Sequence, residues 1–330
     1  MENKPKFKPN PKLRLMDQVH EVLRYHHYAY RTEQTYCHWI LRYLHFFGGK
    51  THPKNLSSHD VEQFLSHLAV KKQVSASTQR QALNALVFLY RQVLGQSLEG
   101  KICHIRSRKK VKTVTVLGHD EACRFFAQMK GTHSLMAKLL YGSGLRLMEC
   151  IRLRIKDIDF DRKRIKVFGK GDKWRSTILA PPIIPALQNH IQRVKELHHT
   201  DLEEGFGSVY LPPALGRKYM SAAKETRWQY VFPSKKRSID PRSGVERRHH
   251  VLESGLQKAV KRAATLADID KRITCHTLRH SFATTMLEKG INIRVLQDLL
   301  GHADVKTTEL YTHVMDKDIS RLTSPLEYIK

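Results

Sequence analysis

Acidic residues and long apolar stretches are scarce in this sequence of 330 residues. It holds 31 Asp and Glu against 58 Lys and Arg, which gives a formal net charge of +27. A chain this basic is expected to bind a polyanion, and nucleic acid is the most common one. No apolar run is long enough to span a bilayer, and the Lys- and Pro-rich N-terminus lacks the apolar core of a signal peptide. We therefore expect a cytoplasmic protein with no membrane association.

Cysteine is also rare, and its spacing is uninformative. The five cysteines are scattered, and no pair shows C-x-x-C spacing, so free thiols in a reducing compartment are expected. The 20 histidines include adjacent pairs such as His249-His250, whose side chains point apart on a helix. The H-E-x-x-H pattern of zinc enzymes does not occur. We expect neither a metal site nor a cofactor.

Apolar periodicity predicts a small helical domain over residues 1–100. From Glu33 to Phe47 the apolar side chains repeat at helical spacing, with Thr32 as the expected N-cap. Similar patterns predict helices over 15–25 and after Ser57 and Ser77. The polar faces of these helices carry basic side chains that are candidate phosphate contacts: Arg31, Lys71, Lys72, Arg80 and Arg91.

A basic linker and a second domain follow the helical domain. Residues 101–114 form a predicted interdomain linker, with six Lys and Arg and no acid between Lys101 and Lys112. Such a segment suits contacts with phosphates rather than with bases. The second domain, residues 115–330, combines predicted helices with a β-hairpin over 164–175. An insertion at about 200–248, rich in aromatic and basic side chains, interrupts it.

The most informative stretch of the chain ends at Tyr311. His276, Arg279 and His280 stand at i, i+3 and i+4 and so share one face of a predicted helix; Gly301-His302 ends a second helix, nine residues before Tyr311. These residue types suit attack on a phosphodiester. Arginine binds two phosphate oxygens, histidine binds phosphate or transfers protons, and tyrosine is a nucleophile when cations lower its pKa. Taken singly, each is more often a cap or a core residue, so the inference depends on the combination.

This combination resembles the tyrosine recombinase family, in which H-x-x-R is followed by G-H and then by the nucleophilic Tyr. The family's other catalytic Arg stands in a G-L-R motif, here ending at Arg146. Its catalytic Lys lies in a β-hairpin, here Lys170, with Lys173 as the alternative. The resemblance implies a mainly α fold with a small β-hairpin or sheet (α+β), in two domains that close on DNA as a clamp. The N-terminal domain would be the family's SAM-like core-binding domain. The implied catalytic residues are Arg146, Lys170, His276, Arg279, His302 and Tyr311.

The resemblance also implies a mechanism without metal or cofactor. Tyr311 attacks a DNA phosphate to form a 3′-phosphotyrosine, while Arg146 and Arg279 hold the non-bridging oxygens. Lys170 protonates the leaving 5′-oxygen. His276 and His302 share proton transfer and phosphate binding, without an individual assignment.

The insertion makes the sequence most similar to integron integrases within this family. Those enzymes recombine a cassette site as a folded single strand and read bases that protrude from its hairpin. The expected partners are therefore duplex DNA at the insertion site and a folded single-stranded hairpin site. By motif position, Trp228, Pro241 and His249 contact the protruding bases, and His250 is the alternative to His249. Aromatic and imidazole faces suit unstacked bases, although Trp228 equally fits a core position.

The C-terminal tail after Tyr311 is relevant to the oligomeric state. In the family, C-terminal tails dock on neighbouring protomers, which implies a homotetramer on DNA. The apolar residues of the tail, Ile319, Leu322 and Leu326, equally suit packing within one chain.

Three rival functions remain open at this stage. A type IB topoisomerase-like enzyme uses similar chemistry but rejoins the same strand. A recombinase can also act on duplex DNA alone. A DNA-binding protein without catalysis is the third alternative, and the complete set of motif residues argues against it.

Overall fold

The computed structural model describes residues 7–98, 102–107, 114–169, 174–219, 221–302, 304–309 and 311. The chain divides into two compact units, Met1–Lys112 and Thr113–Lys330. Each unit has a hydrophobic core of its own. None of the helices in the described ranges is long and apolar enough to cross a membrane.

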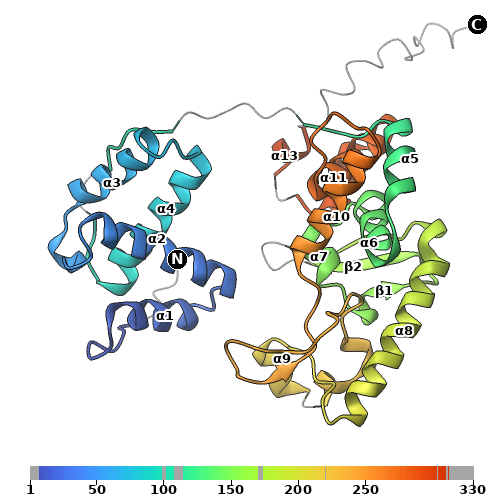
Figure 1. Ribbon diagram of the computed structural model, residues 1–330, viewed down its shortest axis with the longest axis horizontal. Helices are drawn as coiled ribbons and strands as arrows, with labels where there is room; N and C mark the ends of the chain where they lie inside the picture. The colour runs from blue at the N-terminus through green and yellow to red at the C-terminus, as the bar shows by residue number, and fades with distance from the viewer. Residues whose placement is uncertain are drawn as a thin grey trace, which may run out of the picture. The chain divides into compact units, whose positions relative to one another are not determined.

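Unit 1 is a bundle of helices (Figure 1). Its elements are α1 (Leu15–Tyr25), α2 (Tyr30–Phe46), the 3₁₀ turn η1 (Pro53–Asn55), α3 (Ser58–Val70), α4 (Ala76–Phe88) and the π-helical turn η2 (Leu89–Val93). In its core the hydroxyls of Tyr43 and Tyr90 share a hydrogen bond of 2.8 Å. The N-cap prediction at Thr32 is wrong, because α2 already begins at Tyr30 and the N–H of Thr32 bonds to the carbonyl of Ala29.

The first half of the predicted linker, Ile102–Ser107, is held on unit 1 by side chains that bond to its backbone. Buried Gln79 donates to the carbonyl of Ile105 (2.7 Å) and accepts from the N–H of Ser107 (3.0 Å). The N–H of Cys103 donates to the carboxylate of Glu62 (2.6 Å). The basic residues 108–112 lie outside the described residues.

Unit 2 places helices around a small antiparallel sheet (Figure 1). Its strands are β1 (Ile158–Asp159), β2 (Arg164–Phe168) and β3 (Trp174–Ile178), in the order β1-β2-β3. In β2, Ile165 and Val167 are buried while Arg164 and Lys166 are exposed, as the alternation predicts. The mainly helical fold with a small sheet is confirmed. The elements around the site are α5 (His119–Gln128), α6 (Gly131–Ser143), α7 (Leu147–Ile151), β1 (Ile158–Asp159), β2 (Arg164–Phe168), β3 (Trp174–Ile178), α8 (Ile184–Glu203), α10 (Glu253–Leu266), α11 (Cys275–Glu288), α12 (Ile293–Leu300) and α13 (Lys306–Glu309).

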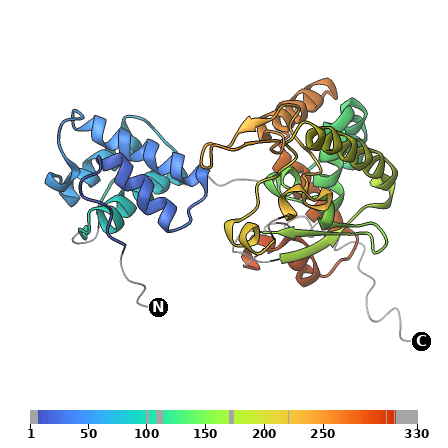
Figure 2. The ribbon, with the colours of Figure 1, turned by 90° about the horizontal axis from the view of Figure 1, so that it is seen from below.

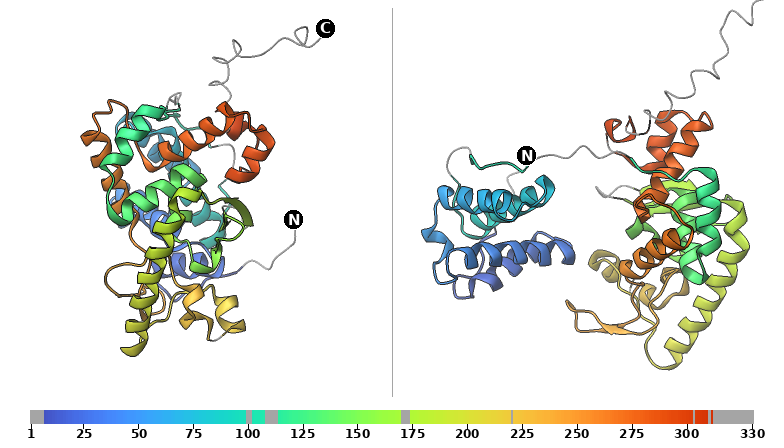
Figure 3. Two further views of the ribbon diagram at one scale, coloured as in Figure 1. Left: turned by 90° about the vertical axis from the view of Figure 1, so that its right-hand side faces the viewer. Right: turned by 45° about the horizontal axis from the view of Figure 1, so that its top comes forward.

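The insertion between α8 and α10 is mostly short turns. It contains α9 (Pro213–Lys218), the 3₁₀ turns η5 (Ala222–Lys224) and η6 (Thr226–Trp228), and a hairpin of β4 (Ser238–Ile239) and β5 (Glu246–Arg247). Figure 2 and Figure 3 show that this hairpin projects from the rest of unit 2. A small core of its own, which includes Val209 and Tyr230, supports the insertion.

Candidate active site

A close approach of two helices creates the framework of the site. Gly144 ends α6 in the left-handed conformation, with φ of 61°. A Cβ atom at this position would lie 2.5 Å from the ring of Phe282 on α11, so only glycine permits this contact. The turn that follows makes Arg146 the N-cap of α7.

Glu149 joins the arginines of the site. Its carboxylate accepts from Arg146 Nη1 (2.7 Å) and forms a bidentate pair with Arg175, with both distances 2.9 Å. Arg279 Nη1 lies 3.9 Å away. Burial alone would raise the pKa of Glu149, but the hydrogen bonds and charges of Arg175 and Arg146 outweigh it and lower the pKa. One carboxylate thus faces three guanidinium groups, and the excess positive charge favours an anion.

Arg279 is buried, and its guanidinium determines the tautomer of the neighbouring His302. Its guanidinium donates to the carbonyls of Gly144 and Leu300 (the latter at 2.6 Å) and to His302 Nε2 at 3.2 Å. Because Nε2 accepts, the proton of neutral His302 sits on Nδ1, which donates to Thr308 Oγ1 (3.0 Å). Burial, then the charges of Arg279 and Arg146, lower the pKa of His302 to about 4. His302 is therefore neutral at pH 7.

Tyr311 is buried beside these groups. Its hydroxyl lies 2.6 Å from His280 Nδ1, and its ring stacks at 6.4 Å from the ring of His302. Burial raises the pKa of Tyr311, while Arg279 and Arg146 act in the opposite direction. In this state Tyr311 keeps its proton at neutral pH.

Most of the predicted catalytic residues are brought together. Arg146, Arg279, His302 and Tyr311 form one cluster, and His276 is exposed at its border with its ring 6.3 Å from that of His280. Desolvation, then Arg279 and Arg146, lower the pKa of His276. Lys170 and its alternative Lys173 lie outside the described residues.

Arg175 and Glu149 also belong to this cluster, although the sequence assigned neither of them a role. Arg175 lies in β3 on the same inward side as buried Thr177, and the period of two was the signal for this position. Glu149 stands three residues after Arg146, and its carboxylate accepts from the N–H of Arg146 (2.8 Å) as in a capping box.

The predicted base-contacting residues lie in the insertion. Trp228 is half-buried, with Lys156 Nζ 4.4 Å from its ring centre and the guanidinium of Arg154 5.7 Å away. Arg154 also lies 4.6 Å from the ring centre of Tyr230, and the rings of His250 and His249 lie 5.3 Å and 5.6 Å from that of Tyr230. Trp228 and His249 therefore flank the pair of Arg154 and Tyr230.

The two remaining candidates differ from these. Pro241 is exposed in the turn between β4 and β5. His250 Nδ1 donates to the carbonyl of Val251 (2.8 Å), which commits this ring to the backbone. Of the two adjacent histidines, His249 is therefore the one whose ring is better placed for another contact.

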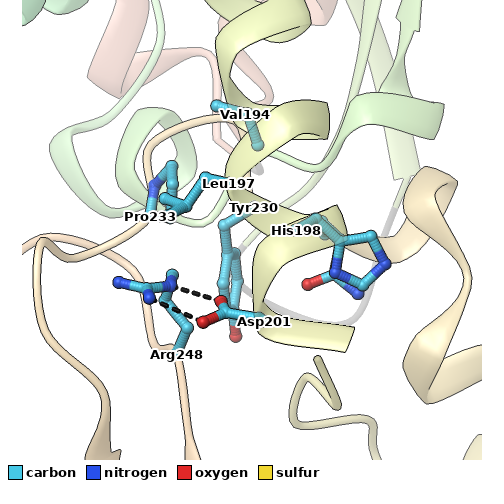
Figure 4. Close-up of a pocket in the computed structure, with 8 residues that line it drawn as sticks. Val194, Leu197, His198, Asp201, Tyr230, Pro233 and Arg248 are labelled. Atoms are coloured by element: carbon cyan, nitrogen blue, oxygen red, sulfur yellow. Dashed lines mark hydrogen bonds and ion pairs between the residues drawn. The ribbon is translucent and has the colours of Figure 1, made fainter. Parts of the chain in front are cut away.

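Asp201 at the end of α8 anchors the hairpin of the insertion (Figure 4). It accepts from Arg248 Nε (2.5 Å) and Nη2 (2.7 Å) and from Arg237 Nη1 (3.0 Å). Arg237 precedes β4 and Arg248 follows β5. Burial alone would raise the pKa of Asp201, but the hydrogen bonds from the two arginines lower it.

We expect Asp201→Asn to destabilise unit 2 by about 2 kcal/mol at pH 7, between the values for surface and buried ion pairs. The carboxylate is 4% exposed, whereas the side chains of Arg237 and Arg248 are 22% and 13% exposed. Because the folded pKa lies below the unfolded value of about 3.9, the stabilisation is complete above that pH and is lost as the pH falls through the folded pKa. Urea unfolding of wild type and variant at pH 7 and pH 3 measures this.

Glu204→Gln is the matched control for that prediction. Glu204 also accepts from Arg237, but its side chain is 49% exposed, so its loss should cost less than about 1 kcal/mol. Equal destabilisation by both substitutions, or a loss for Asp201→Asn that stays the same at pH 3, would contradict the anchoring role.

Comparison with known proteins decides the family. Residues 115–318 match the phage integrase family, and residues 15–99 match the phage integrase N-terminal SAM-like domain. An integrase/recombinase of Escherichia coli is 46% identical over 323 residues, which cover 97% of this chain and 96% of that protein. The chain belongs to the phage integrase family. A tyrosine recombinase of Thermosipho africanus is 30% identical over 303 residues, or 87% of this chain and 90% of the relative.

Solved structures share the fold of this chain. The XerH site-specific recombinase bound to a palindromic difH substrate gives a TM-score of 0.60 at 21% identity, covering 94% of this chain and 85% of that one. A lambda integrase dimer bound to a COC′ core site gives 0.58 at 16% identity, covering 96% and 98%. The resemblance to tyrosine recombinases that the motifs indicated is confirmed at the level of the family.

In the part of this integrase that the structure describes, no group of three His, Cys, Asp or Glu side chains is placed to hold a metal ion. The positive charge at the cluster comes from Arg146, Arg175 and Arg279.

Proposed function

We propose that this chain is a site-specific DNA recombinase that cleaves and rejoins strands through a 3′-phosphotyrosine at Tyr311. The observation that carries the proposal is the cluster of Arg146, Arg175 and Arg279 around the carboxylate of Glu149. The Tyr311 hydroxyl lies beside this cluster and contacts His280. Such a cluster suits a phosphodiester, whose negative charge increases in the transition state. DNA as the partner agrees with the solved relatives, which are bound to DNA sites.

Each residue then has a chemical role. Arg146 and Arg279 bind the non-bridging oxygens, for which Arg146 still has N–H donors beyond those given to Glu149 and the carbonyl of Gly301. His276 and His302 share proton transfer and phosphate binding, and Lys170 protonates the leaving 5′-oxygen. The covalent intermediate retains the energy of the phosphodiester, so rejoining requires no ATP.

We infer further that unit 1 and the linker bind the DNA backbone, as the family's core-binding domain does. The candidate phosphate contacts are all exposed: Arg31, Lys71, Lys72, Arg80 and Arg91. The homotetramer remains a proposal from the family resemblance, because Ile319, Leu322 and Leu326 of the tail lie outside the described residues.

Exchange of strands between two labelled sites would separate a recombinase from an enzyme that only rejoins the same strand.

The finer proposal is that the enzyme integrates and excises gene cassettes at folded single-stranded hairpins, as integron integrases do. The half-buried ring of Trp228 has two cations close to its centre, Lys156 Nζ at 4.4 Å and the Arg154 guanidinium at 5.7 Å. An aromatic face bordered by two cations suits a protruding base and its adjoining phosphate. His249 and the exposed Pro241 supply the other two contacts.

The test compares covalent capture on a nicked hairpin with protruding bases and on its perfectly paired duplex. We expect Trp228→Ala to lower the adduct yield on the hairpin by about tenfold, since stacking of one base contributes about 1–3 kcal/mol, and to change the duplex yield little. Trp228→Phe should retain most of the preference because it keeps an aromatic face.

Tyr219→Ala is the control, because Tyr219 is an exposed aromatic residue of the same insertion outside the group around Arg154. If wild type gave equal adduct yields on both substrates, the proposed recombinase activity would still stand, but the proposed hairpin specificity would be wrong. A loss on both substrates for Trp228→Ala would assign this residue a purely structural role.

A further inference from the structure

The closest partner of the Tyr311 hydroxyl is His280, which the expected mechanism leaves unused. Tyr311 Oη and His280 Nδ1 are 2.6 Å apart, and the two ring centres are 5.5 Å apart. The tyrosine ring packs in an apolar cluster with Phe282 and Leu300. The hydroxyl is thus positioned by this packing on one side and by His280 on the other.

The charges around His280 determine its protonation state. His276 and Arg279 are on the same helix, Arg146 lies at the start of α7, and His302 follows α12. Burial, then His276 and Arg279, lower the pKa of His280 to about 4, so it is neutral at pH 7. Neutral His280 accepts the O–H of protonated Tyr311 at Nδ1 when the ring proton is on Nε2.

We propose that His280 is the general base that accepts the proton of Tyr311 during DNA cleavage. This inference rests on the proposed function, and it adds a catalytic residue to the same site. As the Oη–P bond forms and the P–O5′ bond breaks, the Oη proton moves to Nδ1, and O5′ leaves with a proton from the general acid. During rejoining His280 returns that proton to Oη.

The surrounding charges make this base responsive to DNA. Without DNA, Arg279 and the other cations disfavour an imidazolium at His280, so Tyr311 stays protonated and unreactive. A bound phosphate places negative charge against Arg146 and Arg279, and the transition state adds more. Because an anion stabilises nearby cations, the basicity of His280 rises only when the substrate is present.

Two substitutions separate proton transfer from simple positioning. His280→Asn places an amide oxygen near the former Nδ1, so it keeps a hydrogen-bond acceptor that does not take a proton at neutral pH. His280→Ala removes both the hydrogen-bond acceptor and the group that takes the proton. We expect either variant to form the covalent adduct about 10²-fold more slowly, as is typical for loss of a general base, with DNA affinity and thermal unfolding close to wild type.

Free imidazole provides the first decisive readout. It should restore part of the rate to His280→Ala, where the side chain leaves space, and not to His280→Asn. His133→Asn, at a half-buried histidine away from the site, controls for general effects of losing an imidazole. Wild-type cleavage rates for His280→Asn would overturn the proposal and leave His280 as a positioning residue.

A DNA substrate with sulfur in place of the bridging O5′ provides the second readout, because a thiolate leaves without a proton. We expect this substrate not to rescue the His280 variants, whereas it should rescue loss of the general acid. The cleavage rate of the variants should also increase about tenfold per pH unit, because without the base only ionised Tyr311 attacks the phosphate. The cleavage rate of wild type should depend less on pH. Full rescue by the sulfur would overturn the role of His280 as a base, and absence of any adduct in wild type would overturn the proposed function itself.

Discussion

Tyr311→Phe is expected to bind DNA as tightly as wild type and to form no covalent adduct. The substitution deletes one oxygen atom, and the ring keeps its packing against Phe282 and Leu300. The only described hydrogen bond of the hydroxyl is the one to His280. Removal of a covalent nucleophile leaves no substitute for the attacking oxygen, so the cleavage rate should fall by at least about 10⁴-fold. Capture on a nicked substrate, read on a denaturing gel, measures this directly.

Tyr141→Phe is the matched control for the nucleophile. Tyr141 is a half-buried tyrosine of α6 in the same unit, and its hydroxyl should be dispensable for cleavage. An adduct that persists in Tyr311→Phe would show that another residue attacks the phosphate. Unchanged behaviour of wild type and Tyr311→Phe on every substrate, with tight binding by both, would favour a DNA-binding protein without catalysis.

Local patterns predicted much of the fold, because they report on one element at a time. The alternation in β2 predicted which of its side chains are buried, and the helical repeat predicted α2 to within a few residues at its start. The error at that start has a local cause. Thr32 is a good N-cap by residue type, but the chain already turns at Ala29, so that Thr32 lies within the first turn of α2.

The geometry inside the site was less predictable, because it depends on how separate elements meet. The spacing of H-x-x-R placed His276 and Arg279 on one helix, yet the structure exposes His276 and buries Arg279. The histidine that meets Tyr311 is His280. Which ring meets the hydroxyl is decided by how Tyr311 packs against α11, and helical periodicity contains no information on that packing.

Contacts across long sequence separations explain the other omissions. Arg175 reaches Glu149 and, through Nε, the carbonyl of Leu299, 124 residues away in the chain. Asp201 meets Arg248 across 47 residues. Each of these side chains looks like an ordinary surface charge in the sequence. Only the packing of β3 against α12 and of the insertion against α8 turns them into buried partners.

Arg279→Ala is expected to slow cleavage by about 10²–10³-fold, the usual loss when one preorganised donor to a developing negative charge is removed. Arg279 also donates to the carbonyls of Gly144 and Leu300. Its removal leaves two buried acceptors unpaired, so we expect a loss of stability of about 2 kcal/mol as well. Single-turnover cleavage at saturating enzyme, together with thermal unfolding, separates the two effects.

Arg279→Lys makes the argument more specific. A lysine carries the charge, but its compact ammonium does not span two carbonyls and a phosphate as the planar guanidinium does, so we expect little recovery of rate. Arg294→Ala, at an exposed arginine of α12, removes the same charge away from the cluster and should change the rate by only a few fold. If Arg294→Ala slowed cleavage as much as Arg279→Ala, overall charge would explain the effect. Near-normal cleavage by Arg279→Lys would instead show that the positive charge suffices without the planar fork of donors.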